Sequence, residues 1–350
     1  MFYSLPTEAK LDVFKFLNFE DLCSVKQTNL YFYDFLNKYE GELAREEFNK
    51  ISIDDIDNFN EDSHKIIIPK AKDFDFALNK QFEWKDILEK PIPLYLPDQS
   101  SNKNVICLTK DYNDEERHII LELPSIIRSK EDIKIVYYYL NKLFNCSFKH
   151  LCIEKFIFNP KLIELFFGNF PKQFYVQNCD YSITGHNIDI IIFQFIFNYL
   201  IGGNLKINFL RDRAAIEKHK DILFKILTSG DNFKEVYLKL SNLPGMFHQF
   251  INVQRIYDYI IEYIATTTDI SKMTPNIILD FLATAFPGLK LNERAEKVKI
   301  KQTEQLFDTK YTKYRILNIH NPKVRFRVCN EERENFISFY VKIKIKKVEF

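Results

Sequence analysis

Histidine and cysteine are the residue types in this chain that most readily supply metal ligands or nucleophiles. The seven histidines are scattered, and no two have the i, i+4 spacing that places two ligands on one face of a helix. The six cysteines include no Cys-x-x-Cys pair, so zinc-binding and thioredoxin-like motifs are not indicated. His150, Cys152 and Cys179 are the one thiol–imidazole combination to consider, and ordinary core packing is the favoured interpretation of these three residues.

Motifs for phosphate binding, acyl transfer and calcium binding were also sought in the sequence. There is no Gly-x-Ser-x-Gly elbow, no P-loop and no set of kinase motifs, and the chain has only 8 glycines. Asp54, Asp55 and Asp57 lack the downstream glycine and glutamate of a calcium loop. We therefore expect a non-catalytic protein without a cofactor and without a bound metal.

Charge and hydrophobicity are ordinary for a folded protein of 350 residues. Hydrophobic residues make up 46% and charged residues 28%, and the formal net charge is +1. This balance predicts no bulk attraction to nucleic acid or to a membrane. The most apolar run, residues 188–201, is too short to span a bilayer. Residues 1–10 do not resemble a secretory leader, and the cysteines are expected to be reduced, so we expect an intracellular protein of the cytoplasm, the nucleus or both.

The elements at the N-terminus are expected to be three short helices within a module of residues 1–48. Pro6 suits the first turn of a helix, and Asn18 and Asn29 are suitable caps for the two helices that follow. Three helices in so few residues bury little apolar area. We expect the module to be marginally stable unless it packs on a partner or on the rest of the chain.

Residues 49–110 are expected to form a connector that packs on the following domain. Residues 51–62 contain five acids and no base, which is typical of a solvated segment. Pro91 to Pro97 contains three prolines in seven residues, which favours extended backbone.

Residues 111–350 are expected to form one domain in which helices alternate with short strands. Expected strands begin near Phe148, Phe170, Leu205, Phe233 and, more weakly, Phe286. The expected helices are residues 131–145, 159–168, 187–201 and 214–228. Helix–strand units of this kind predict a degenerate leucine-rich-repeat-like stack with a parallel sheet. Ordinary α/β packing remains the alternative.

The last part of the chain, residues 305–350, has the alternating pattern of strands. Residues 314–319, 323–328 and 336–348 alternate apolar and polar residues, and residues 330–335 are expected to be a hairpin connection. An antiparallel cap would close the repeat stack. The expected fold class is therefore mixed α/β.

Basic residues recur at every second position in two of these expected strands. Residues 301–350 contain 12 bases and 6 acids. Two adjacent strands would thus present a basic face that is suited to an acidic or phosphorylated substrate segment. Lysines that protect an exposed edge from unwanted pairing are the alternative interpretation. The six residues of this candidate patch are Lys323, Arg325, Arg327, Lys342, Lys344 and Lys346.

The N-terminal module carries an ordered series of residues. These are Leu5-Pro6-Thr7-Glu8, Val13-Phe14, Leu17, Asp21-Leu22, Val25, Thr28-Asn29, Phe32 and Phe35-Leu36. The series resembles the F-box family over about 40 residues, and the chain as a whole is similar to the diverged F-box proteins of nematodes with irregular leucine-rich-repeat-like C-terminal regions. Phe32 stands where many family members have tryptophan.

The resemblance implies a substrate-recognition adaptor of an SCF-type ubiquitin ligase in the ubiquitin-like conjugation pathway. The F-box would dock a Skp-type linker protein, and through it a cullin–RING ligase, while the C-terminal domain would bind an unknown protein substrate. The residues that would form the module core and docking surface are Leu5, Pro6, Val13, Phe14, Leu17, Leu22, Val25, Phe32 and Phe35. The alternative is a repeat-type interaction or structural protein whose F-box-like helices only cap the stack.

Overall fold

The computed structural model divides the chain into two compact units. Unit 1 contains residues 1–151 and 155–176, and unit 2 contains residues 152–154 and 177–350. The structure describes residues 2–58, 64–70, 72, 90–96, 104–112, 115–153, 156–168, 172–183, 188–209, 215–228, 232–240, 249–283, 288–304, 308–334 and 339–348.

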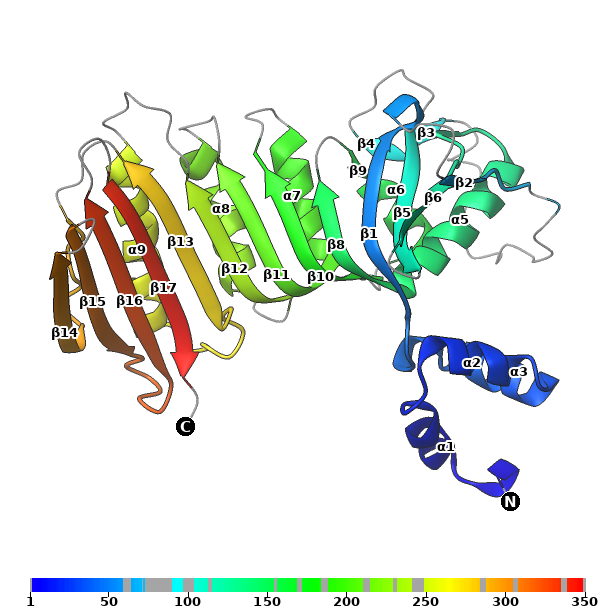
Figure 1. The fold of residues 1–350 in the computed structure, drawn as a ribbon, viewed down its shortest axis with the longest axis horizontal. Coiled ribbons are helices and arrows are strands. Elements are labelled where there is room, and N and C mark those ends of the chain that lie inside the picture. Colours follow the sequence, from blue (N-terminus) through cyan, green and yellow to red (C-terminus); the bar gives the residue numbers. More distant parts are fainter. Residues whose placement is uncertain are drawn as a thin grey trace. The chain divides into compact units, whose positions relative to one another are not determined.

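Unit 1 begins with a helical block, residues 2–44. Its elements are η1 (Phe2–Ser4), α1 (Thr7–Phe14), α2 (Phe19–Lys26), α3 (Leu30–Lys38) and η2 (Glu40–Glu42), all labelled or visible in Figure 1. The Asn18 side chain accepts a hydrogen bond from the amide of Asp21, and the Asn29 side chain accepts one from the amide of Phe32. Both asparagines are N-caps, as the sequence predicts, and the three predicted helices are present.

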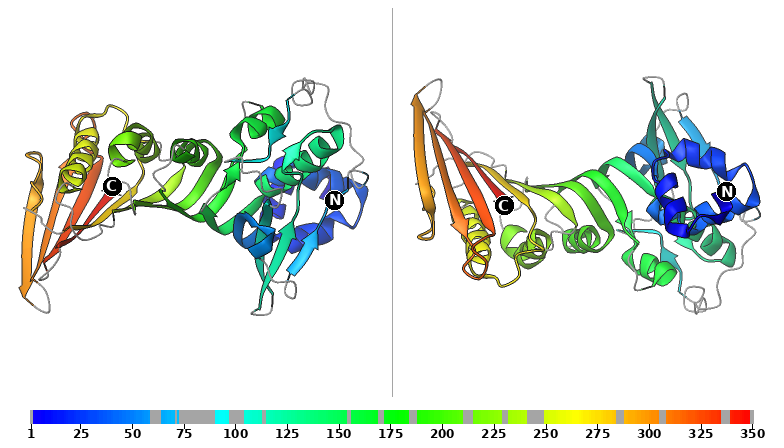
Figure 2. Two further views of the ribbon diagram at one scale, coloured as in Figure 1. Left: turned by 90° about the horizontal axis from the view of Figure 1, so that it is seen from above. Right: turned by 90° about the horizontal axis from the view of Figure 1, so that it is seen from below.

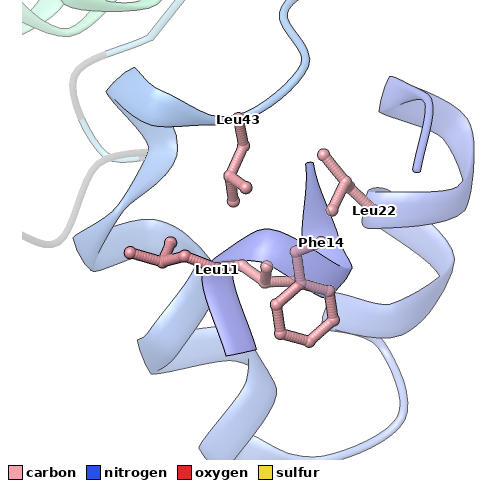
Figure 3. Close-up of a cluster of buried hydrophobic side chains, with 5 residues drawn as sticks. Leu11, Phe14, Leu22 and Leu43 are labelled. Atoms are coloured by element: carbon pink, nitrogen blue, oxygen red, sulfur yellow. The ribbon is translucent and has the colours of Figure 1, made fainter. Parts of the chain in front are cut away.

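The helices of the block enclose a small apolar core. Its buried members are Leu11, Phe14, Leu22, Leu36 and Leu43. Figure 3 shows Leu11 and Phe14 from α1, Leu22 from α2 and Leu43 from the segment after η2 converging on one space. Half-buried rings surround this core, and the rings of Phe2, Phe14 and Phe32 make edge-to-face contacts with centroids 5.4–5.9 Å apart. The block therefore has a core of its own, although a small one.

The remainder of unit 1 is built on a mixed sheet with the strand order β8-β1-β5-β6-β2. β1 pairs in parallel with β8 and antiparallel with β5, so it is an interior strand. The strands are β1 (Glu46–Asp55), β2 (His64–Ile67), β5 (Asn104–Tyr112), β6 (Glu115–Leu121) and β8 (Cys146–Ile153). Between and after them come η3 (Ile56–Asn58), α5 (Lys130–Phe144), α6 (Pro160–Phe167) and two short pairs, β3 (Ile92–Pro93) with β7 (Ile126–Ile127) and β4 (Tyr95–Leu96) with β9 (Ile157–Phe158).

The expected connector over residues 49–110 is therefore corrected in its described part. Ile51 on β1 and Ile106 on β5 are buried, and both strands belong to the sheet of unit 1. The connector was expected because of acids such as Asp54 and Asp55. These two residues end β1, in which Ile51 and Ile53 alternate with polar residues as in a strand. The short strands β3 and β4 agree with the extended backbone expected from Pro91 onward; Pro97 lies outside the described residues.

Unit 2 begins as a series of strand–helix units. β11 pairs in parallel with β12, and β12 pairs in parallel with β13. In chain order the elements are β10 (Phe174–Ser182), α7 (Ile188–Tyr199), β11 (Leu200–Phe209), α8 (Ala215–Thr228), β12 (Phe233–Leu240), α9 (Gln249–Thr266) and β13 (Asn276–Ala283). Figure 2 shows that α7, α8 and α9 lie on one face of these strands and leave the other face open.

Four antiparallel strands complete unit 2. They are β14 (Glu296–Glu304), β15 (Asp308–Leu317), β16 (Arg325–Glu334) and β17 (Phe339–Val348), in the order β14-β15-β16-β17-β13. β17 pairs antiparallel with β13 and so joins the C-terminal strands to the parallel ones. The antiparallel C-terminal strands agree with the alternating pattern of the sequence.

Several expected boundaries in unit 2 need correction. The expected hairpin connection at residues 330–335 is wrong, because β16 continues to Glu334. Two elements, α9 and β14, were not expected, and the weakly expected strand at 286–291 is replaced by β13 at Asn276–Ala283. Phe170, Phe286 and residues 336–338 lie outside the described residues.

The described elements establish a mixed α/β protein, as the sequence predicts. Parallel and antiparallel strand pairs occur in both units, and helices alternate with strands along most of the chain. Within the part of the chain that the structure describes, no helix combines the length and the apolar character needed to cross a membrane.

Two buried tyrosines of unit 2 predict a loss of stability in alkali. Tyr257 on α9 and Tyr314 on β15 share a hydroxyl–hydroxyl hydrogen bond. Burial raises the pKa of Tyr257 from 10.0 to about 12 and the pKa of Tyr314 above its ordinary range. The unfolded chain therefore releases protons that the folded chain retains once the pH exceeds about 10. The free energy of unfolding is expected to fall as the pH rises from about 10 to about 12.

Urea denaturation followed by circular dichroism at several pH values checks this expectation. The Tyr257→Phe variant is the control, because it removes one of the two titrating groups and keeps the ring. Its stability is expected to decline less steeply with pH than that of the parent chain. Equal slopes for the two proteins would show that Tyr257 does not cause the decline.

Candidate functional site

The outer surface of the helical block carries exposed apolar side chains. Phe16, just after α1, is 91% exposed, and Leu30, the first residue of α3, is 73% exposed. Val13 lies next to Phe16, whose amide donates a hydrogen bond to the Val13 carbonyl. Tyr33 lies one turn after Leu30 on α3 and is also exposed. Large apolar groups on so small a block are typical of a protein-docking surface.

The nine residues expected to form the module core and docking surface divide into three groups. Phe14 and Leu22 are buried in the core, so they act on the module's stability. Leu5, Pro6 and Val13 are exposed and available to a partner. The half-buried residues that pack against the core are Leu17, Val25, Phe32 and Phe35.

A buried lysine fastens the N-terminal segment to α3. The Lys10 ammonium donates hydrogen bonds to the carbonyl oxygen of Tyr3 at 2.9 Å and to the hydroxyl of Tyr31 at 2.6 Å. It also lies 5.3 Å from the centroid of the Tyr31 ring. Because Lys10 is almost fully buried, these contacts replace water around its charge. The segment that carries Leu5 is thereby held in place.

Phe16 and Leu30 were missed by reasoning from the sequence. Both lie at helix ends, where the helical periodicity that distinguishes inward from outward positions gives no signal. The sequence did contain a local indication of their exposure. Phe16 directly follows the charged Lys15, and Leu30 directly follows the N-cap Asn29, so neither residue belongs to the apolar stripe of a helix. Large apolar residues outside the stripe of a short helix indicate a contact beyond the module.

A second candidate surface lies on the open face of the C-terminal strands in unit 2. Arg327 on β16 is directly opposite Lys346 on β17, so the structure brings these two predicted residues together. Lys344 lies on the same face, opposite Cys329. Lys323 lies in the turn before β16 and is therefore not part of the strand that carries Arg327. Arg325, at the start of β16, is opposite Val348 and not opposite a second basic residue. The expected period-two series from Lys323 is therefore only partly formed.

Lys342 belongs to a different environment from Lys344 and Lys346. It is opposite Asp280 on β13 and Glu331 on β16, and its ammonium lies 5.5 Å from the Tyr237 ring centroid. Asp280 accepts hydrogen bonds from the hydroxyls of Tyr237 and Tyr340. At this end of the face, acidic residues of the neighbouring strands therefore lie opposite Lys342.

Three further cations extend the basic end of the face onto two neighbouring strands. Lys299 on β14 is opposite Lys313 on β15, and Arg315 on β15 is opposite Arg327. We call the six residues of this region the basic face: Lys299, Lys313, Arg315, Arg327, Lys344 and Lys346. Lys299, Lys313 and Arg315 were not among the basic residues predicted from the sequence. The alternation of lysine with Val298 and Ile300 would have been sufficient to predict the strand that carries Lys299.

The thiol and metal chemistry considered from the sequence finds little support in the geometry. His150 is exposed on β8, whereas Cys179 is buried, and burial raises the pKa of the Cys179 thiol well above its ordinary value. A thiol in that state is a poor nucleophile near neutral pH. Among the described residues, no three histidine, cysteine or acidic side chains are grouped so that they could hold a metal ion.

An apolar hollow in unit 2 lies between α8 and α9. Its volume is about 310 Å³, and its lining includes Leu223, Phe224 and Leu227 of α8 and Ile256 and Ile260 of α9.

Residues 67–210 are similar to a family described as a domain of unknown function, DUF8381. The matched range starts after the helical block and β1, and it ends just beyond β11. It covers less than half of the chain, and the family's description names no activity. No curated protein and no solved structure matches the chain.

Proposed function

We propose that this chain is a substrate-recognition adaptor of an SCF-type cullin–RING ubiquitin ligase. The helical block acts as an F-box that binds a Skp-type linker protein, and the helix–strand units form a degenerate leucine-rich-repeat-like region that holds a protein substrate. The adaptor performs no chemistry itself.

The observation that carries this proposal is the exposed apolar surface of the helical block. The block contains three short helices, of which α2 and α3 begin at asparagine caps, and this order agrees with the F-box resemblance. They keep Phe14, Leu22 and Leu36 inside and leave Val13, Phe16 and Leu30 outside. Burying such side chains in a partner provides most of the free energy of a helix-based interface.

A second candidate function is favoured by contacts between the helical block and the rest of unit 1. The Asn145 amide donates a hydrogen bond to the Glu40 carboxylate of the block at 3.0 Å, and directly after the block the Arg45 guanidinium donates one to the Phe144 carbonyl at 3.2 Å. These contacts suit a block that only caps the stack of a repeat-type interaction protein. Deleting residues 1–44, which spares β1, separates the two functions: unfolding of the remainder supports the cap, and a folded remainder that cannot bind the linker supports the adaptor.

The Phe16→Ala variant tests the docking surface. Because the Phe16 side chain is 91% exposed, its removal is expected to leave the fold unchanged. Loss of an aromatic anchor is expected to weaken binding of a recombinant Skp-type linker by roughly tenfold or more. A calorimetric titration of each purified full-length chain measures this change.

Ile319→Ala is the matched control for Phe16→Ala. Ile319 is also exposed, at 54%, but it lies in unit 2, far along the chain from the helical block. Its replacement is expected to leave linker affinity unchanged. Equal affinities for the Phe16→Ala and parent chains would count against the proposed docking surface.

A further inference from the structure

β14 forms a free edge of the sheet in unit 2. In the strand order it pairs with β15 only, and no described strand lies on its other side. Every residue from Glu296 to Gln302 is exposed, including Val298 at 42% and Ile300 at 58%. An exposed edge strand offers a row of backbone amide and carbonyl groups to an incoming strand.

The two sides of β14 differ in chemistry. Lys299 and Lys301 face the open side of the sheet, because they are opposite Lys313 and Tyr311 of β15. Ile300 is opposite the buried Thr312 and therefore lies on the other side. A strand that pairs with β14 would meet lysines on one side and apolar side chains on the other.

The basic face next to β14 contains cations placed directly opposite one another. Lys299 is opposite Lys313, Arg315 is opposite Arg327, and Arg327 is opposite Lys346. Among the described strand pairs, Glu296 of β14 is the one acid opposite a member of this set, on the other side of Arg315. Like charges in such positions destabilise a sheet. Within the described residues, none of the six cations of the basic face forms an ion pair, whereas Arg333 at the other end of β16 is paired with Glu331. An acidic ligand would relieve this repulsion.

We infer that the β14 edge and the basic face bind an extended acidic segment of a partner protein. The segment adds to the sheet as a strand beside β14. Its acidic side chains alternate with apolar ones, so that the acids lie near Lys299 and Lys301 while the apolar side chains cover Val298 and Ile300.

An acidic peptide segment fits this surface better than a second copy of β14 or a nucleic acid does. A second copy of β14 would bring lysines against lysines, which disfavours self-pairing. A nucleic acid would satisfy the basic face, but it has no peptide backbone to pair with the β14 edge and no aliphatic side chains to cover Ile300. A polypeptide in which acidic and apolar residues alternate can pair with the β14 edge, place its acids near the basic face and cover Val298 and Ile300.

This inference specifies the class of substrate that the proposed adaptor captures, and in that sense it rests on the proposed function. The two are tested separately, because the peptide experiment contains no linker protein. Binding of the peptide without binding of the linker would support the surface and contradict the adaptor. The opposite result would support the adaptor and contradict the surface.

Fluorescence anisotropy of a labelled peptide with the full-length chain is the test. The probe has nine residues, the length of β14, and alternates glutamate with valine. A second peptide has the same composition but keeps its glutamates in one block. We expect saturable binding of the alternating peptide, weaker binding of the block peptide and a steep loss of affinity with added salt.

Two single variants test whether the peptide binds the basic face or exposed lysines in general. Lys299→Glu reverses one charge of the basic face and is expected to lower peptide affinity roughly tenfold. Lys272→Glu is the matched control, since Lys272 is an exposed lysine in the turn before β13, and it is expected to have no effect. Circular dichroism verifies that both variants are folded.

Four results would overturn the inference. The first is no binding of the alternating peptide, and the second is equal binding of the alternating and block peptides. The third is displacement of the peptide by single-stranded oligonucleotide at lower concentrations than by unlabelled peptide. An equal loss of affinity in the Lys272→Glu and Lys299→Glu variants would also contradict the assignment to this surface.

Discussion

Replacing Leu36 by alanine is expected to unfold the helical block. Leu36 lies on α3 and is completely buried in the core with Leu11, Phe14, Leu22 and Leu43. Truncation of a buried leucine costs about 2–5 kcal/mol, because it removes apolar contacts and leaves a cavity. That cost is comparable to the whole stability that so small a core provides. The variant should therefore lose linker binding as well as block structure.

Limited proteolysis and linker titration together measure the effect of the Leu36 change. Cleavage within residues 2–44 is expected to become fast, while the fragments of unit 2 persist. Leu30→Ala is the matched control: it is the same exchange on the same helix, but Leu30 is 73% exposed. It should resist proteolysis like the parent and still bind the linker less tightly. If Leu36→Ala were as resistant as Leu30→Ala, the proposed core would be wrong.

A second large effect is expected at Gly203 in unit 2. A Cβ atom at this position of β11 would lie 2.5 Å from the carbonyl oxygen of Gln177 on β10. The obstructing atom belongs to the backbone, so it cannot move away by a change of side-chain rotamer. Gly203→Ala is expected to separate the two strands locally and to lower the free energy of unfolding by about 1–3 kcal/mol or more.

Gly41→Ala is the matched control for this exchange. Gly41 lies in η2, and an added Cβ would meet nothing within 4 Å. Its replacement is expected to be neutral or to stabilise the chain by up to about 1 kcal/mol, because alanine restricts the unfolded chain. Urea denaturation of both variants provides the comparison. Equal stability of the two would contradict the close approach of β10 and β11.

The sequence predicted most reliably those elements whose caps and periodicity agree. Asn18 and Asn29 mark the starts of α2 and α3, and α5 at Lys130–Phe144 agrees with the helix expected from periodicity at residues 131–145. The strands β8, β11 and β12 also lie where short apolar segments follow a helix. Local signals were sufficient in these cases because they required no knowledge of neighbouring strands.

The misses occurred where the deciding contacts are distant in the sequence. β1 looked like a connector because of its acids, and only its pairing with β5 and β8 makes it an interior strand. The basic face could not be assembled for the same reason: Lys299 and Lys344 belong to one surface only through the order of four strands. The exposure of Phe16 likewise depends on how three helices pack, which periodicity at a helix end does not reveal.

Docking of a Skp-type linker protein by the helical block is the interaction on which the proposed adaptor function depends. The most direct test is a calorimetric titration of the recombinant linker into the full-length chain, with Phe16→Ala and Leu36→Ala titrated under the same conditions. We expect saturable one-to-one binding by the parent, weaker binding by folded Phe16→Ala and none by Leu36→Ala. No binding by a folded parent chain would contradict the adaptor function and leave the helical block as a structural cap.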